Sequence, residues 1–192
     1  MRTGLVTFIV GAVVLSGCGR YMPPVSPEMR APKAVENLVV IPSESGVAFS
    51  WTSPEQDRRG KELNNIEGYS IERKEIAQRG DETNPSVRFE DLGFVSDTHI
   101  VKREELRKEA REAGKIGRNI KAPSELTKFS FTDRTPKVGV TYIYQIVPKN
   151  NGGVEGQVGQ VVKIAFQGTQ SAVLLSTSKE LEDIAAKQLP VQ

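Results

Sequence analysis

The chain has 192 residues, of which 38% are hydrophobic, 26% charged and 6% aromatic. This composition is typical of a soluble globular domain and argues against wholesale disorder and against a polytopic membrane protein. The 26 Lys and Arg against 24 Asp and Glu give a formal net charge of +2, which is too balanced to favour nucleic acid as a partner. With one Cys and one His, the chain lacks the residues for a Cys/His zinc cluster or an internal disulfide.

The first seventeen residues have the pattern of a secretory signal peptide. Arg2 supplies the positive start, an apolar run follows from residue 5 to residue 15, and the small residues Ser16 and Gly17 come next. As a helix, an apolar run of about ten residues rises only ~15 Å, half the thickness of a hydrocarbon core. We therefore expect residues 1–17 to be a signal peptide rather than a permanent span.

The segment Leu15-Ser16-Gly17-Cys18 resembles the lipobox of bacterial lipoproteins. The resemblance implies cleavage between Gly17 and Cys18, a diacylglyceryl group on the Cys18 thiol and acylation, typically with palmitate, of the new amino group. Two or three acyl chains hold a protein stably on a bilayer, whereas one chain does not. In this family an Asp after the Cys is associated with inner-membrane retention, so Gly19 favours the outer membrane in an organism that has one. The alternative is an ordinary signal peptide with a coincidental Cys.

Prolines set residues 18–34 apart from the rest of the chain. Pro23, Pro24, Pro27 and Pro32 favour an extended segment without a packed core. We expect a linker that separates the lipid anchor from the folded domain.

Residues 35–167 are dominated by short segments in which apolar residues alternate with polar ones. This period of two is typical of half-buried strands, and many short strands with turn residues between them predict an all-β antiparallel sandwich. The Asn-Gly pair within Lys149-Asn150-Asn151-Gly152-Gly153 predicts a type I′ hairpin. The alternating apolar positions are Leu38 and Val40; Val47, Phe49 and Trp51; Tyr69 and Ile71; Phe129 and Phe131; Tyr142, Tyr144 and Ile146; and Val162, Ile164 and Phe166.

Four of these segments, in this order, resemble strands of a fibronectin type III domain. The segments are Val47-x-Phe49-Ser50-Trp51-Thr52-x-Pro54, Ile66-x-Gly68-Tyr69-x-Ile71-x-Arg73, Phe131-x-Asp133, and Gly139-x-Thr141-Tyr142-x-Tyr144-x-Ile146. The resemblance implies an immunoglobulin-like sandwich with a core built on Trp51, Tyr69, Tyr142 and Tyr144. It also implies that the Tyr142 hydroxyl bonds back to the preceding backbone, as a tyrosine corner. Pro148 departs from the family pattern, and we expect the sixth strand to stop pairing there.

Two segments do not fit the sandwich. Residues 96–127 form an insertion with a predicted helix from Lys102 to Gly114, begun by Asp97 or Thr98 and carrying a narrow stripe of Leu106, Ala110 and Ala113. This helix is either a solvated filling of a loop or an appendage that binds a partner. Residues 168–192 form a tail in which Thr177-x-x-Glu180 matches a capping box before a short amphipathic helix.

Motifs for catalysis and for cofactors are absent from the sequence. It contains no Gly-x-Ser-x-Gly elbow and no phosphate-binding glycine loop. We expect His99 to be an exposed loop residue, and no metal or cofactor to be required. Asp81 and Glu82 lack the spacing of an EF-hand. The tripeptide Arg79-Gly80-Asp81 matches the integrin-recognition sequence, and we interpret it as an ordinary turn.

These observations predict a non-enzymatic binding or scaffolding lipoprotein of the bacterial envelope. Its partners would be the bilayer, through acylated Cys18, and an envelope protein or a cell-wall glycan. A structural subunit of a larger secretion or pilus-type assembly is the alternative. A lipid-anchored hydrolase is the third hypothesis, and it requires a pocket near the insertion that is lined by two carboxylates.

Overall fold

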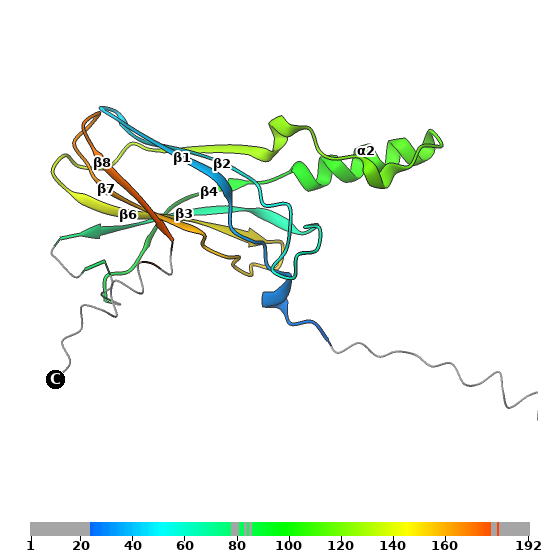
Figure 1. Cartoon of the computed structure of the whole chain (residues 1–192), viewed down its shortest axis with the longest axis horizontal. Helices are drawn as coiled ribbons and strands as arrows, with labels where there is room; N and C mark the ends of the chain where they lie inside the picture. Colours follow the sequence, from blue (N-terminus) through cyan, green and yellow to red (C-terminus); the bar gives the residue numbers. More distant parts are fainter. Residues whose placement is uncertain (1–23, 78–80, 83, 85, 178–179, 181–192) are drawn as a thin grey trace, which may run out of the picture.

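The computed structural model describes residues 24–77, 81–82, 84, 86–177 and 180. Two antiparallel sheets contain all the strands described, one with the order β1-β2-β5 and one with the order β4-β3-β6-β7-β8 (Figure 1). The only α-helix among the described residues, α2, lies between β4 and β5. The elements are η1 (Pro27–Arg30), β1 (Glu36–Ser43), β2 (Gly46–Thr52), β3 (Ile66–Ile76), β4 (Glu90–Ser96), α2 (His99–Glu112), η2 (Gly117–Asn119), η3 (Ser124–Thr127), β5 (Lys128–Asp133), β6 (Thr141–Asn150), β7 (Gln160–Ala165) and β8 (Ala172–Thr177).

The core lies between the two sheets and is rich in aromatic rings. The Trp51 and Tyr69 rings meet edge to face with centroids 5.4 Å apart, and the Phe49 and Tyr144 rings lie 4.9 Å apart. Such contacts join β2 of one sheet to β3 and β6 of the other, and they add to the free energy gained from apolar burial. The strand order and this core confirm the predicted all-β antiparallel sandwich.

The sixth strand continues past Pro148, contrary to the expectation from sequence. Pro148 pairs with Tyr69, and β6 reaches Asn150. The Pro148 carbonyl accepts a hydrogen bond from the Gly156 N–H (2.7 Å), on the side away from β3. The N and O atoms of one residue point to the same side of an antiparallel strand, so the missing N–H removes no bond to β3.

The turn after β6 is not of type I′. The Gly153 N–H donates to the Asn150 carbonyl (2.8 Å), and Gly153 has a φ of 73°. Asn151 and Gly152 are not among the residues with positive φ, as a type I′ turn would require. The turn is therefore of type I, followed by a bulge in which Gly153 takes the left-handed conformation. The Asn150 side chain stabilises it by accepting from the backbone N–H groups of Gly152 and Val154, both at 3.0 Å.

The sandwich extends beyond residue 167, the predicted end of the domain. Strand β8 pairs with β7 over six residues, from Ala172 opposite Ala165 to Thr177 opposite Gln160. Its sequence is a short apolar run without alternation, so periodicity alone does not distinguish it from a tail. The capping-box contacts after it are present: Thr177 and Glu180 each accept a bond from the other's backbone N–H. The predicted helix beyond Glu180 lies outside the described residues.

Candidate functional site

A cavity of about 340 Å³ opens where α2 leaves the sandwich. Three segments that are distant in the sequence form its walls: the β2–β3 connection, the first turn of α2, and the chain that leads into β5. The lining residues are Glu55, Gln56, Glu62, His99, Arg103, Lys121, Ala122, Ser124 and Thr127.

His99 lines this cavity and is buried, which corrects the expectation of an exposed loop residue. One carboxylate oxygen of Asp97 contacts two nitrogen atoms of His99. This Oδ1 atom accepts from the His99 backbone N–H (2.9 Å) and lies 2.6 Å from His99 Nδ1. The first contact begins α2 at His99, three residues before the predicted start, while Thr98 makes no side-chain cap bond.

Asp97 is completely buried and collects further donors from the core. Its Oδ2 atom accepts hydrogen bonds from the Tyr69 hydroxyl (2.6 Å) and the Ser53 hydroxyl (3.1 Å). Burial alone would raise the pKa of the Asp97 carboxyl, but the hydrogen bonds from His99 and Tyr69 outweigh it and the pKa is lowered. Burial and the Asp97 charge also raise the pKa of the Tyr69 hydroxyl, which therefore stays protonated.

The ionised Asp97 fixes the hydrogen-bonding state of the imidazole. Because a carboxylate only accepts, His99 Nδ1 carries the proton, and Nε2 is left with a lone pair in the neutral ring. Among the described residues, Trp51 Nε1 is the one fully enclosed side-chain nitrogen or oxygen without a partner. His99 Nε2 makes no hydrogen bond with the described residues and is not fully enclosed. Because His99 lines the cavity, this nitrogen is accessible from it.

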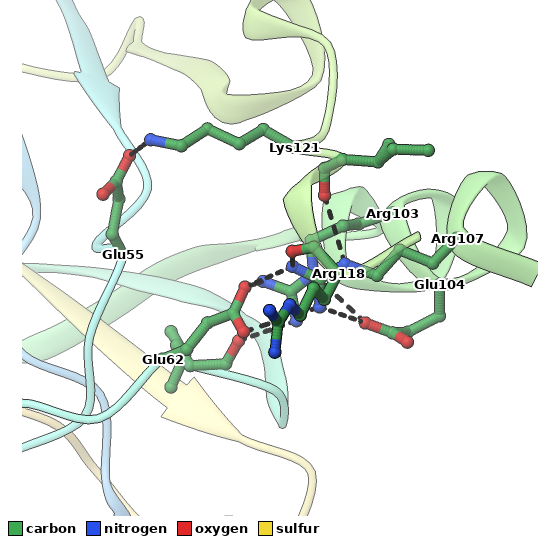
Figure 2. A network of polar contacts seen from close by, with 9 residues as sticks. Glu55, Glu62, Arg103, Glu104, Arg107, Arg118 and Lys121 are labelled. Atoms are coloured by element: carbon green, nitrogen blue, oxygen red, sulfur yellow. Dashed lines mark hydrogen bonds and ion pairs between the residues drawn. The ribbon is translucent and has the colours of Figure 1, made fainter. Parts of the chain in front are cut away.

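An arginine–glutamate network connects the β2–β3 connection to α2 beside the cavity (Figure 2). Arg103 is buried, donates to the Leu63 carbonyl (3.0 Å) and pairs with Glu62 (3.1 Å). Arg107 pairs with the same Glu62 (2.7 Å) and donates to the Ile120 carbonyl (3.1 Å). The network thus ties α2 both to the sandwich and to the chain that follows the helix.

Gly117 lets that following chain lie against the helix. A Cβ atom at this position would come within 2.6 Å of the Arg107 carbonyl oxygen, which is part of the helix backbone. A larger residue would therefore push η2 away from α2.

The cavity contains the two carboxylates that the hydrolase hypothesis requires, Glu55 and Glu62. The hydrogen bond from Arg107 lowers the pKa of Glu62, with burial opposing it, and the nearby Arg103 lowers it further. A glycosidase general acid needs a raised pKa, so Glu62 is unsuited to that role. Glu55 lies 3.5 Å from Lys121, and both side chains are exposed. Both carboxylates of the cavity are therefore paired with cations from other segments of the chain, Glu62 with Arg107 and Glu55 with Lys121.

The residues proposed for the core lie where the resemblance implies. Trp51, Tyr69, Tyr142 and Tyr144 are all fully buried. The Tyr142 hydroxyl accepts from the Lys137 backbone N–H (3.1 Å), five residues back in the chain, as in a tyrosine corner. Gly17 and Cys18 lie outside the described residues.

The Arg79-Gly80-Asp81 motif is described only at its last residue. Asp81 is buried and accepts from the Ala77 backbone N–H (3.1 Å), and its neighbour Glu82 pairs with Lys163 (2.6 Å). Within the described residues, no three His, Cys, Asp or Glu side chains gather as a metal site. No helix in that part of the chain is long and apolar enough to cross a membrane.

Sequence reasoning missed a second buried carboxylate, Asp133, at the end of β5. Its Oδ2 atom accepts from the Tyr144 hydroxyl (2.9 Å) and from Arg73 (2.8 Å), and its Oδ1 atom accepts from the backbone and hydroxyl of Thr135. Both residues belong to motifs identified in the sequence, Asp133 to Phe131-x-Asp133 and Arg73 to the third-strand motif. Their pairing, 60 residues apart, was not predicted.

Searches against protein-family models and curated proteins give no match. Among solved structures, the chain is similar to the twitchin kinase region of C. elegans, with 13% identity over 73% of this chain and 17% of that chain and a TM-score of 0.40. A structure described as a myokine has 13% identity over 73% of this chain and all of its own, with a TM-score of 0.35. The third fibronectin III domain of human KIAA0343 protein has 12% identity over 81% of this chain and 90% of its own, with a TM-score of 0.35. The fold is therefore described by its own strand order, an antiparallel sandwich of a three-stranded and a five-stranded sheet.

Proposed function

We propose that this protein is a membrane-anchored lipoprotein of the bacterial envelope that acts as a non-enzymatic binding or scaffolding module. The acylated Cys18 would hold it on the bilayer, on the outer membrane where the organism has one. Residues 18–34 would separate the folded domain from the lipid. Confinement to a surface raises the effective concentration of the domain for a neighbouring partner.

The observation that carries the binding role is the way α2 is held. The helix projects from one end of the sandwich (Figure 1). Three of its four buried residues, His99, Ile100 and Arg103, lie in its first five positions, and the fourth is Ala110. A helix that buries so little contributes little to the core, yet buried polar contacts to Asp97 and Leu63 fix its base. A solvated helix whose base is held in this way is well suited to present a surface to another molecule.

The exposed surface of α2 favours a protein over a glycan as the partner. The helix contains no Phe, Tyr or Trp, the side chains on which sugar rings stack. Its charges are of both signs, which suits a protein surface with a complementary pattern and not a uniform polyanion. The exposed charged residues are Lys102, Glu104, Glu105, Lys108, Glu109, Arg111 and Glu112.

Crosslinking in the native envelope tests the binding role. We expect the wild-type chain to be crosslinked to a defined protein, and the double variant Lys108→Glu/Arg111→Glu to lose that product, because both changes reverse charge on the exposed helix. Lys137→Glu, on an exposed loop of the sandwich, is the matched control and should retain the product. Absence of any partner with the wild-type chain, or equal loss in the control, would contradict the proposal.

The membrane anchor is tested separately by Cys18→Ser. Without the thiol we expect the chain to leave the membrane fraction and appear in the soluble fraction of the envelope. Unchanged processing and unchanged sedimentation with membranes would disprove the lipid anchor while leaving the binding role of α2 open to the crosslinking experiment.

A further inference from the structure

Strand β8 is an exposed edge of the five-stranded sheet, and no described strand covers its outer side. Its sequence, Ala172-Val-Leu-Leu-Ser-Thr177, contains no charged residue, no Pro and no Gly. The exposed fractions are 37% for Val173, 59% for Leu174 and 45% for Leu175. An unpaired apolar edge of this kind is a template for the addition of another strand.

The other edge strands carry features that hinder pairing. Strand β1 has a register shift after Glu36 and contains Pro42. Strand β4 begins with Glu90 and Asp91, and its pairing with β3 is also irregular. Strand β5 has a charged residue at each end. By contrast, β8 pairs with β7 over its whole length without a register shift, so its outer edge is regular as well.

The two faces of β8 follow from its pairing with β7. Val173 and Leu175 lie opposite Ile164 and Val162, both fully buried core residues, and therefore share the inner face of the sheet. Leu174 lies opposite Lys163 and occupies the outer face. Val173 and Leu175 are nevertheless exposed. The row of inward-facing apolar side chains therefore extends past the buried core to the edge of the sheet.

We propose that β8 pairs with β8 of a second copy of this chain, antiparallel and around a two-fold axis at Leu174. Opposite residues of antiparallel strands share a face, so this register keeps the inner faces of both copies on one side. Leu174 then lies opposite the same residue of the second copy, and Val173 lies opposite Leu175 of the second copy. The register brings four apolar side chains together on the inner face and two on the outer face. It places no like charges opposite each other, because β8 has no charged residue. The inference goes beyond the proposed function and requires neither the lipid nor α2.

Cysteine crosslinking tests this register, because the chain has a single natural cysteine. The chain from residue 18 onward with Cys18→Ser has no thiol and no lipid. Adding Leu174→Cys places two thiols on the two-fold axis, where Cα atoms about 4.5–5.5 Å apart are within the range of a disulfide. We expect a covalent dimer on mild oxidation.

Ile41→Cys in the same background is the matched control. Ile41 lies on β1 and is 60% exposed, so its thiol is as accessible as that of Leu174→Cys. We expect it to form no covalent dimer, because Ile41 lies on β1 and far from the β8–β8 contact in the sequence. Equal crosslinking of both variants would show random collision, and absence of crosslinking in both would show that β8 does not pair; either result overturns the proposal.

Sedimentation equilibrium without oxidant gives an independent measurement. Leu174→Lys would set two ammonium groups opposite each other and should weaken the dimer by about tenfold or more. Val138→Lys, at a position 68% exposed in a loop, should leave it unchanged. A monomeric Cys18→Ser chain would overturn the proposal. If serine substitutions at Leu181, Ile184 and Leu189 then produced a dimer, the C-terminal segment of the same chain would be identified as the occupant of the edge instead.

Discussion

Two buried aspartates, Asp97 and Asp133, perform similar tasks in different electrostatic surroundings. Each lies at the end of a strand, and each accepts a hydrogen bond from a tyrosine hydroxyl of the five-stranded sheet, Tyr69 for Asp97 and Tyr144 for Asp133. Asp133 also pairs with the cation Arg73. The comparison shows that one arrangement, a carboxylate that collects donors at the end of a strand, fixes two different junctions.

The difference lies in what balances the negative charge. Asp133 has a guanidinium at 2.8 Å, whereas Asp97 has the hydroxyls of Ser53 and Tyr69 and the backbone and ring of His99. The Asp133 cluster secures the loop before β6, and the Asp97 cluster secures the base of α2. We therefore expect the consequences of removing each carboxylate to differ in kind.

The largest expected effect is that of Asp133→Ala. It leaves the largely buried Arg73 without its closest anion, and breaking such a pair costs about 4 kcal/mol of the free energy of unfolding. Urea unfolding of the Cys18→Ser chain measures this loss. The double variant Asp133→Ala/Arg73→Leu should recover part of it, because no buried cation remains. A double variant no more stable than Asp133→Ala would show that the charge of Arg73 is not the cause.

Asp97→Ala should cost somewhat less, about 3 kcal/mol, because it leaves neutral donors unsatisfied rather than a cation. Here the loss should be accompanied by faster hydrogen exchange in the first turn of α2, where Asp97 accepts the His99 N–H. Asp133→Ala serves as the control and should leave that exchange less affected at equal global stability. Equal acceleration in both variants would mean that Asp97 has no special role at the base of the helix.

Acidification should destabilise the protein through both carboxyl groups by less than either deletion. The pKa values of Asp97 and Asp133 are lowered in the folded state because their hydrogen bonds outweigh burial. A carboxyl with a lowered pKa stabilises the fold above its ordinary pKa of about 3.9, and this contribution is lost as the pH falls through the lower folded-state value. Urea unfolding between pH 6 and pH 2 should show stability falling at the acid end. A flatter profile is expected for Asp133→Asn, and an unchanged slope would contradict the lowered pKa.

The smallest expected effects are those of Tyr69→Phe and Tyr144→Phe. Each removes one hydrogen bond to a charged acceptor and should cost about 1.5 kcal/mol of the free energy of unfolding. Tyr69→Phe should cost at least as much, since its bond to Asp97 is the shorter, 2.6 Å against 2.9 Å. Tyr142→Phe, which loses a bond to a neutral backbone N–H, is the control and should cost less than both.

Local patterns in the sequence determined the sandwich. Alternation at Val47, Phe49 and Trp51 fixes which face of β2 is buried, because a strand turns successive side chains to opposite faces. The same logic held for Tyr69 and Ile71 on β3 and for Tyr142 and Tyr144 on β6. All of these residues belong to the buried core cluster, so the periodicity alone was sufficient to place them in the core.

Only the tertiary structure decided the polar sites. Ser53, Tyr69 and Asp97 meet although 44 and 28 residues separate the first two from Asp97. That meeting buries His99, which has no apolar pattern to reveal its burial. The helix contacts the sandwich through His99, Ile100 and Arg103, whereas Leu106 of the predicted apolar stripe is not among its buried residues. Strand β8 was missed for a related reason. Whether a short apolar run forms a strand depends on whether the edge of a neighbouring strand is free to pair with it. Here the edge of β7 is free, and β8 pairs with it. Periodicity records burial along one segment, whereas hydrogen-bond partners depend on how separate segments come together.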